Sequence, residues 1–117
     1  MRFRARQRLR TNKDFASVRK LGQRQPFLGF LAQFSVNVKG MTGRRIGFRI
    51  SRKVGNAVIR NRIKRVFREL FRLHQNELPD QCDLVLVAHP SLPTIERKSI
   101  EEDFRKLCEK ISSRAIT

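Results

Sequence analysis

The sequence predicts one small folded domain that combines helices with strands, and three observations support this prediction. Hydrophobic side chains make up 39% of the 117 residues and charged side chains 32%, a balance typical of a folded domain rather than a disordered tail. Apolar residues recur at helical spacing in three segments, and they alternate or run together in three others. A chain of this length can bury most of its apolar surface without crosslinks. We therefore expect a single domain over residues 1–117, with residues 1–10 as a basic N-terminal arm.

The first helix is predicted to begin after Thr11. Thr11 and Asp14 have the spacing of a capping box, in which each side chain bonds the backbone of the other residue. The apolar positions that follow at helical spacing are Phe15, Val18 and Leu21. Gly22 is expected to end this helix.

Two alternating segments predict strands. In residues 27–38 one face holds Phe30, Ala32, Phe34, Val36 and Val38, and the other holds Phe27, Leu31, Gln33 and Asn37. The segment KGMTGRR carries two glycines and should turn the chain into a second run, where Ile46, Phe48 and Ile50 oppose Arg45, Arg49 and Ser51. We expect the two strands to form a hairpin sheet with an apolar side and a cationic side.

A longer helix is expected after the loop RKVGN, and it should end at residues 78–80. Its apolar stripe is predicted to be Ile59, Ile63, Val66, Leu70 and Leu73. Residues 83–88, DLVLVA, are almost continuously apolar, which is typical of a central strand and often of a parallel pair. Ser99 and Glu102 form an S-x-x-E cap for a last helix. The apolar positions of that helix are Ile100, Phe104, Leu107, Cys108 and Ile111.

The charge of the chain predicts a polyanionic partner. Twenty-seven Lys and Arg face ten Asp and Glu, and nineteen of the basic residues are Arg, whose planar fork pairs with phosphate oxygens. Residues 1–68 hold twenty basic residues and one acid, Asp14, which suggests one binding surface. Arg stands at every even position from 2 to 10, so an extended arm would carry five guanidinium groups along one edge. The alternative for this arm is a frayed, solvated tail.

Several other kinds of site are not predicted. The longest apolar run, residues 84–88, is far shorter than the roughly 18 residues of a membrane span, and no signal-peptide pattern opens the sequence, so we expect a cytoplasmic protein. Cys82 and Cys108 lack a second ligand at metal spacing and are expected to be buried, reduced thiols. His74 is predicted to be a surface residue at a helix end, and His89 to lie in a loop or to touch a phosphate. No catalytic residue is predicted, because no nucleophile stands with a base at catalytic spacing.

The longer helix carries a cationic stripe opposite its apolar one. The residues at four-residue steps are Arg60, Lys64, Arg68 and Arg72, and Arg65 broadens the stripe. Like charges at this spacing repel each other, so a negatively charged partner would offset the cost. Upstream, Gly55 and Asn56 allow a turn whose N–H groups could dock a phosphate, flanked by Arg52 and Lys53. The alternative is an ordinary loop followed by a solvated helix face; eleven basic residues between positions 44 and 72, opposed by Glu69 alone, favour binding.

These residues carry a resemblance. The run SRKVGNAVIRNRIKRVFREL, residues 51–70, closely resembles the RNR-box region of the bacterial ribonuclease P protein subunit. A weaker resemblance extends over nearly the whole chain, from RLRTNKDF at the first helix to the DLVLVA strand and the closing helix.

The resemblance implies a fold and a division of labour. It implies an α+β two-layer sandwich of order αβββαβα, with a four-stranded mixed sheet, three helices and a left-handed βαβ crossover, an exception to the right-handed rule. In that family a large RNA uses Mg²⁺ to cleave precursor tRNA and release the mature 5′ end, and the protein is an accessory subunit of this endoribonuclease. The implied partners are the ribonuclease P RNA and precursor tRNA, with one monomeric protein per RNA, no dedicated protein cage for the metal, no membrane and no DNA.

Carried onto this chain, the resemblance names two groups of residues. Those expected to contact the catalytic RNA are Arg52, Lys53, Gly55, Asn56, Arg60, Asn61, Arg62, Lys64, Arg65 and Arg68. The resemblance implies that Phe15, with Arg19 one helical turn later, lines a cleft for the 5′ leader, and the alternation of the strands predicts that Gln33 and Arg49 point into the same cleft. Phe15 would stack on a splayed base, although plain core packing explains it equally well. Arg19 departs from the family, which often has a second aromatic there, so phosphate contact would replace stacking.

Three other functions remain possible on the sequence alone. A ribosomal or general RNA-binding protein would share the charge but have no role in cleavage. A DNA-binding module is disfavoured, because no helix-turn-helix pattern precedes the basic helix and few Asn or Gln could read bases. An autonomous protein nuclease would need clustered carboxylates, which are scarce where the positive charge lies.

Overall fold

The computed structural model describes residues 7–9, 11–36 and 43–116. The elements are α1 (Asn12–Leu21), β1 (Gln23–Pro26), β2 (Phe30–Val36), β3 (Arg44–Arg49), α2 (Ala57–His74), the 3-10 helix η2 (Gln75–Glu77), β4 (Cys82–Ala88), the 3-10 helix η3 (Leu92–Thr94) and α3 (Arg97–Ile116). This order is the αβββαβα arrangement that the resemblance implies. Most of the predicted basic arm, residues 1–6 and 10, lies outside the described residues, and so do residues 37–42 of the predicted turn.

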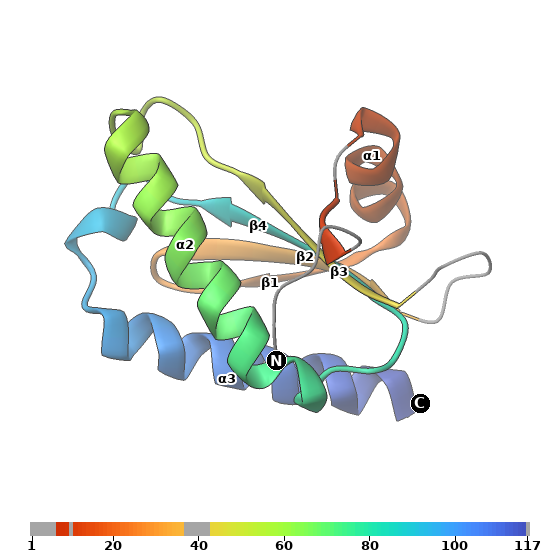
Figure 1. The fold of residues 1–117 in the computed structure, drawn as a ribbon. Coiled ribbons are helices and arrows are strands. Elements are labelled where there is room, and N and C mark those ends of the chain that lie inside the picture. The colour runs from red at the N-terminus through yellow and green to blue at the C-terminus, as the bar shows by residue number, and fades with distance from the viewer. Residues whose placement is uncertain (1–6, 10, 37–42, 117) are drawn as a thin grey trace.

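The four strands form one mixed sheet of order β1-β2-β4-β3 (Figure 1). β2 is antiparallel to β1 and to β4, whereas β3 is parallel to β4. The chain passes from β3 through α2 to β4 by a left-handed crossover. The prediction that residues 83–88 form a central strand with a parallel neighbour is therefore confirmed.

The predicted hairpin between the two alternating strands is wrong, because β4 lies between β2 and β3. β4 takes this place because it is apolar on both faces: Leu84 and Leu86 pack into the main core, and Val85 packs into a second cluster on the other side. A strand of that kind gains most when both of its faces are covered. Periodicity read along the chain could not show this pairing, which joins segments far apart in sequence.

β1 is an element that the hydrophobic pattern did not predict. Its sequence, QRQP, has no apolar alternation, and it pairs with β2 alone at one edge of the sheet. Pro26 fits there, because an edge strand can tolerate a residue that has no N–H to donate. The predicted strand over residues 27–38 is shorter, covering Phe30–Val36.

The helices cover the two faces of the sheet unequally (Figure 1). α2 and α3 pack on one face and enclose the main core. α1 lies on the other face, where Val18 packs with Leu9 and Val85 in a smaller cluster. The alternation predicted for β2 is confirmed, because Phe30, Ala32 and Phe34 all point into the main core.

The buried side of α2 differs in part from the predicted stripe. Ile63 and Leu70 are buried as expected, but Phe67 and Phe71 complete the buried side. Leu73, predicted as the last residue of the stripe, is 50% exposed. Helix α2 meets the sheet and α3 along one side, and Phe71 is 0% exposed on that side. Phe67 is 1% exposed and packs in the same core.

Helix ends follow the local chemistry of the chain. The capping box of α1 is confirmed: Thr11 Oγ1 accepts a hydrogen bond from the Asp14 N–H at 3.1 Å, and the Thr11 N–H donates to Asp14 Oδ2 at 3.4 Å. The predicted cap of α3 at Ser99 is wrong, because α3 begins at Arg97. The Ile100 N–H already donates to the Glu96 carbonyl, which starts the helix earlier than the S-x-x-E pattern indicated. All five predicted apolar positions of α3 are buried.

The two cysteines are free and buried, as predicted. Burial raises the pKa of the Cys82 thiol to about 12, and it raises the pKa of the Cys108 thiol to about 12 as well. Both side chains belong to the main core. Over the described part of the chain, no helix is apolar and long enough to span a membrane.

Candidate nucleic-acid interface

Helix α2 presents its basic side chains over the arc that does not pack on the sheet. We define the α2 ridge as Arg60, Asn61, Arg62, Lys64, Arg65 and Arg68. Asn61, Arg62 and Arg65 are exposed, and the other three are half-buried. At about 100° per residue, the positions from Arg60 round to Arg62 span roughly 200° of the helix circumference. The ridge is therefore a broad cationic surface rather than a narrow line.

The two flanks of the ridge border different neighbours. Lys64 and Arg68 line a pocket of about 240 Å³ together with Arg8 and Phe15. On the opposite flank, Arg62 lines an apolar pocket of about 170 Å³ that also includes Arg97. The structure thus brings Lys64 and Arg68 close to the α1 side of the molecule, and it separates Arg62 from them.

One polar atom of the ridge, in Arg60, is buried. This atom, Nε, has no hydrogen-bond acceptor within the residues that the structure describes. A buried polar group without a partner is uncommon and costs free energy.

The turn that enters α2 has a structural role in addition to any binding role. Asn56 is the N-cap, and its Oδ1 accepts a hydrogen bond from the Ile59 N–H at 3.0 Å. A Cβ at Gly55 would lie within 2.9 Å of the Ile59 side chain, so glycine permits this close turn. The N–H of Ile59 is consequently occupied by the cap. Arg52 and Lys53 are exposed on the same turn.

The α1 side of the sheet brings together two of the four residues predicted for the leader. The Arg49 guanidinium lies 5.2 Å from the centre of the Phe15 ring, a cation–π distance. Phe15 is half-buried and also packs on the small cluster beneath α1. Gln33 is on the same face but only 6% exposed, whereas Arg19 is exposed on α1. Both roles considered for Phe15 are therefore compatible with its position.

One cation near this face is already neutralised by the protein. Arg45 donates from Nε and from a terminal nitrogen to the two carboxylate oxygens of Asp83, at 2.9 and 2.8 Å. Its other terminal nitrogen lies 3.6 Å from Asp14 on α1. The hydrogen bond to Asp83 raises the pKa of Arg45 above its usual value, although burial opposes this. Arg45 therefore ties α1 to the sheet, a role that the alternation pattern did not reveal.

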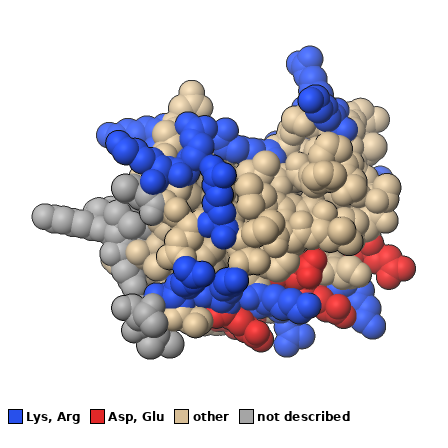
Figure 2. Space-filling view, turned by 180° about the vertical axis from the view of Figure 1, so that it is seen from behind, with Lys and Arg blue, Asp and Glu red and all other residues tan. Residues whose placement is uncertain are grey.

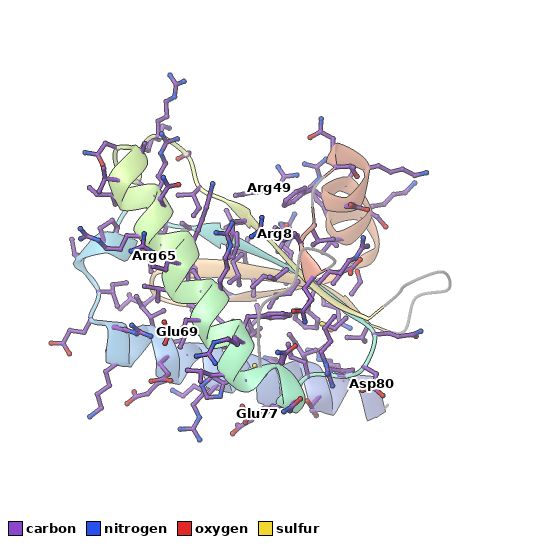
Figure 3. The ribbon with its side chains drawn as sticks, in the orientation of Figure 1. Arg8, Arg49, Arg65, Glu69, Glu77 and Asp80 are labelled. Carbon is purple, nitrogen blue, oxygen red and sulfur yellow. The ribbon has the colours of Figure 1, made fainter. Side chains whose placement is uncertain are left out.

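No carboxylate lies on α2 before Glu69. On the face seen in Figure 2, from behind, the carboxylates lie in the lower part, mixed with Lys and Arg, and Lys and Arg also lie along the upper rim. Figure 3 likewise places Glu69, Glu77 and Asp80 lower than Arg8, Arg49 and Arg65. Glu69 lies 3.9 Å from Arg72 and 3.6 Å from Arg97. Arg72 is the last residue of the predicted cationic stripe, and it lies beside Glu69. The ridge therefore ends before Arg72.

The two histidines do not join the ridge. His74 stands at the end of α2 as predicted; its side chain is half-buried, at 18% exposed, and contacts two carboxylates. Its nitrogens lie 2.8 Å from Glu77 and 3.3 Å from Glu101, which links α2 to α3. His89 lies in the loop after β4 and contacts Ser91 Oγ at 2.7 Å.

Comparison with known proteins decides the family. Residues 3–112 match the family described as Ribonuclease P. The chain belongs to this family. The ribonuclease P protein component of Desulforamulus reducens is 36% identical over 99 residues, which cover 85% of this chain and 80% of the relative. That of Finegoldia magna is 35% identical over 108 residues, covering 92% of each protein.

Solved structures of the ribonuclease P family share the fold. The RNase P protein from Thermotoga maritima superposes with a TM-score of 0.77 at 30% identity, covering 89% of this chain and 96% of that one. The Staphylococcus aureus RNase P protein gives a TM-score of 0.78 at 28% identity, covering 90% and 97%. The sheet with its three helices, as implied by the sequence resemblance, is thus the fold of this family.

Proposed function

We propose that this chain is the protein subunit of a ribonuclease P, in which it binds the catalytic RNA and the 5′ leader of precursor tRNA and assists removal of the leader. One observation carries the proposal: in a chain of this family, α2 exposes a broad cationic arc that is free of acids as far as Glu69. Phosphate contacts of this kind supply most of the affinity of a protein for a nucleic acid.

Contact with the leader is supported by the pair of Phe15 and Arg49. A guanidinium over an aromatic ring offers both a flat surface and a positive charge to a single-stranded nucleotide. Arg19, exposed on the same helix as Phe15, could contact a leader phosphate in place of an aromatic residue. Gln33 contributes less directly, because it is buried.

Catalysis is assigned to the RNA, which would use Mg²⁺. Within residues 7–9, 11–36 and 43–116, no three His, Cys, Asp or Glu side chains come together as metal ligands would. The protein's own residues bind and position RNA in this scheme. We further propose that one monomeric protein associates with one RNA in the cytoplasm.

Two variants test the proposal at one fixed salt concentration, because phosphate-driven affinity falls steeply with salt. Lys64→Glu should weaken assembly with the catalytic RNA, whereas Phe15→Ala should mainly weaken binding of precursor tRNA relative to mature tRNA. Lys106→Glu, an equal charge change at an exposed position of α3, is the control and should affect assembly much less. Equal losses for Lys64→Glu and Lys106→Glu would contradict the ridge, and equal losses for both tRNAs in Phe15→Ala would contradict a leader cleft.

A further inference from the structure

Arg8 brings a third element into contact with the ridge. It forms a parallel bridge to Ile46 at the edge of the sheet, and the adjacent Leu9 N–H donates to the Ile46 carbonyl at 3.0 Å. Leu9 is buried, which anchors this segment on β3. Arg8 itself is exposed and lines the 240 Å³ pocket with Lys64 and Arg68. We call this the β3-edge pocket.

Two aromatic residues, Phe15 and Phe48, line the β3-edge pocket. The Arg68 guanidinium lies 5.5 Å from the centre of the Phe48 ring. Gly47 also lines the pocket, and a Cβ there would come within 2.7 Å of the Phe15 ring and 2.9 Å of Leu9 Cβ. The absence of a side chain at Gly47 therefore lets α1 and the Leu9 segment approach β3.

The charge in the pocket is of one sign. Arg8, Lys64 and Arg68 line it, and no Asp or Glu is among the described residues that do. Burial lowers the pKa of Arg68, and the positive charge of Arg8 lowers it further, so the charged form of Arg68 is disfavoured in this pocket. An anion placed between these cations would reverse this repulsion.

We propose that the β3-edge pocket binds one phosphate group of an RNA strand, held by Arg8, Lys64 and Arg68. This inference rests on the proposed function and adds Arg8 and a defined position to it. The pocket is smaller than the roughly 300–1,000 Å³ of typical ligand sites, which suits a backbone phosphate better than a whole nucleotide. The pocket lies between the ridge, proposed to contact the catalytic RNA, and Phe15, proposed to contact the leader. Arg8 and Arg49 lie between α1 and α2 in Figure 3. The phosphate therefore belongs either to the leader or to the catalytic RNA.

The test compares Arg8→Gln with Arg105→Gln in the full chain, because Arg105 is an exposed arginine of α3 and gives the same change of charge. Affinity is measured against the ribonuclease P RNA alone, and then for precursor and mature tRNA in the assembled complex, each over a range of salt. Arg8→Gln should weaken one of these interactions about tenfold and lower its salt dependence by about one phosphate contact. A loss confined to precursor tRNA identifies the leader, and a loss with the RNA alone identifies the catalytic RNA.

The β3-edge site is overturned if Arg8→Gln matches Arg105→Gln in every assay. Thermal unfolding of both variants checks that the exposed Arg8 side chain was removed without loss of the fold. Failure of this site is distinguishable from failure of the proposed function, because the unmodified chain would still increase precursor cleavage by the RNA. If the unmodified chain gave no such increase, the proposed function itself would fail.

Discussion

Gly47 is the residue at which three parts of the molecule meet. A Cβ at this position would lie 2.7 Å from the tip of the Phe15 ring, closer than carbon atoms approach in folded proteins. We expect Gly47→Ala to lower the free energy of unfolding by about 1–3 kcal/mol, measured by urea denaturation, because the neighbours must move apart.

A second substitution identifies the source of this strain. Phe15→Leu removes the ring atoms that the new Cβ would meet, so the cost of Gly47→Ala should be smaller in the Phe15→Leu background by at least about 0.5 kcal/mol. Some cost should remain, because Leu9 Cβ is also within 2.9 Å. An identical cost in both backgrounds would mean that Phe15 does not pack on Gly47.

The buried thiols make stability depend on alkaline pH. Burial raises the pKa values of Cys82 and Cys108 from the ordinary 9.0 to about 12, so the folded chain holds both protons more tightly than the unfolded chain. Their contribution is complete below pH 9 and is lost as the pH rises from 9 towards 12. In that window the free energy of unfolding should fall by roughly 1.4 kcal/mol per pH unit for each thiol. The double variant Cys82→Ala/Cys108→Ala should show a shallower fall, and parallel pH profiles would contradict this explanation.

Some residue roles could be predicted from the sequence and others could not. The faces of β2 and β3 followed from alternation, which correctly put Gln33 and Arg49 opposite the main core. The alternation could not show that Arg45, on the same face as Arg49, is held by Asp83, because the two residues are 38 positions apart. The placement of Arg8 in a pocket with Lys64 was equally hidden, since a local bridge to Ile46 brings it there.

At the scale of the element, the start of α2 depends on Asn56. Its side chain accepts the Ile59 N–H, so Asn56→Ala should lower the free energy of unfolding by about 1 kcal/mol. Asn56→Ser keeps a capping oxygen and should restore most of that stability, as measured by urea denaturation. The RNA affinity of the two variants distinguishes a capping role of Asn56 from direct contact with RNA. If Asn56→Ser recovers the RNA affinity that Asn56→Ala loses, Asn56 acts by positioning the ridge. A serine variant as unstable as the alanine variant would show that the hydrogen bond does not hold the helix.

The elements themselves were predictable wherever hydrophobic periodicity was strong. All three helices and the strands β2, β3 and β4 were expected within a few residues of their observed bounds. β1 was missed by this reasoning because its stability comes from pairing with β2 rather than from buried apolar side chains. The order of the strands was also beyond periodicity, and the left-handed crossover was implied only by the family resemblance.

On the scale of the whole molecule, the fold separates charge in a way that the linear sequence only suggested. The crossover sets α2 beside the edge strand β3, so the ridge lies next to the α1 face and to Arg8. The carboxylates of the second half of the chain lie largely on α3 and at the far end of α2. The ridge before Glu69 and the neighbouring β3-edge pocket are thus suited to a polyanion, whereas most acids of the second half of the chain lie on α3 or after the ridge.

The most direct test of this assignment is reconstitution. The full chain is mixed with a bacterial ribonuclease P RNA at low Mg²⁺, and the rate of 5′ leader removal from precursor tRNA is measured with and without the protein. We predict that cleavage requires the RNA and that the protein increases its rate. An unchanged rate, or cleavage by the protein in the absence of the RNA, would contradict the role of an accessory subunit.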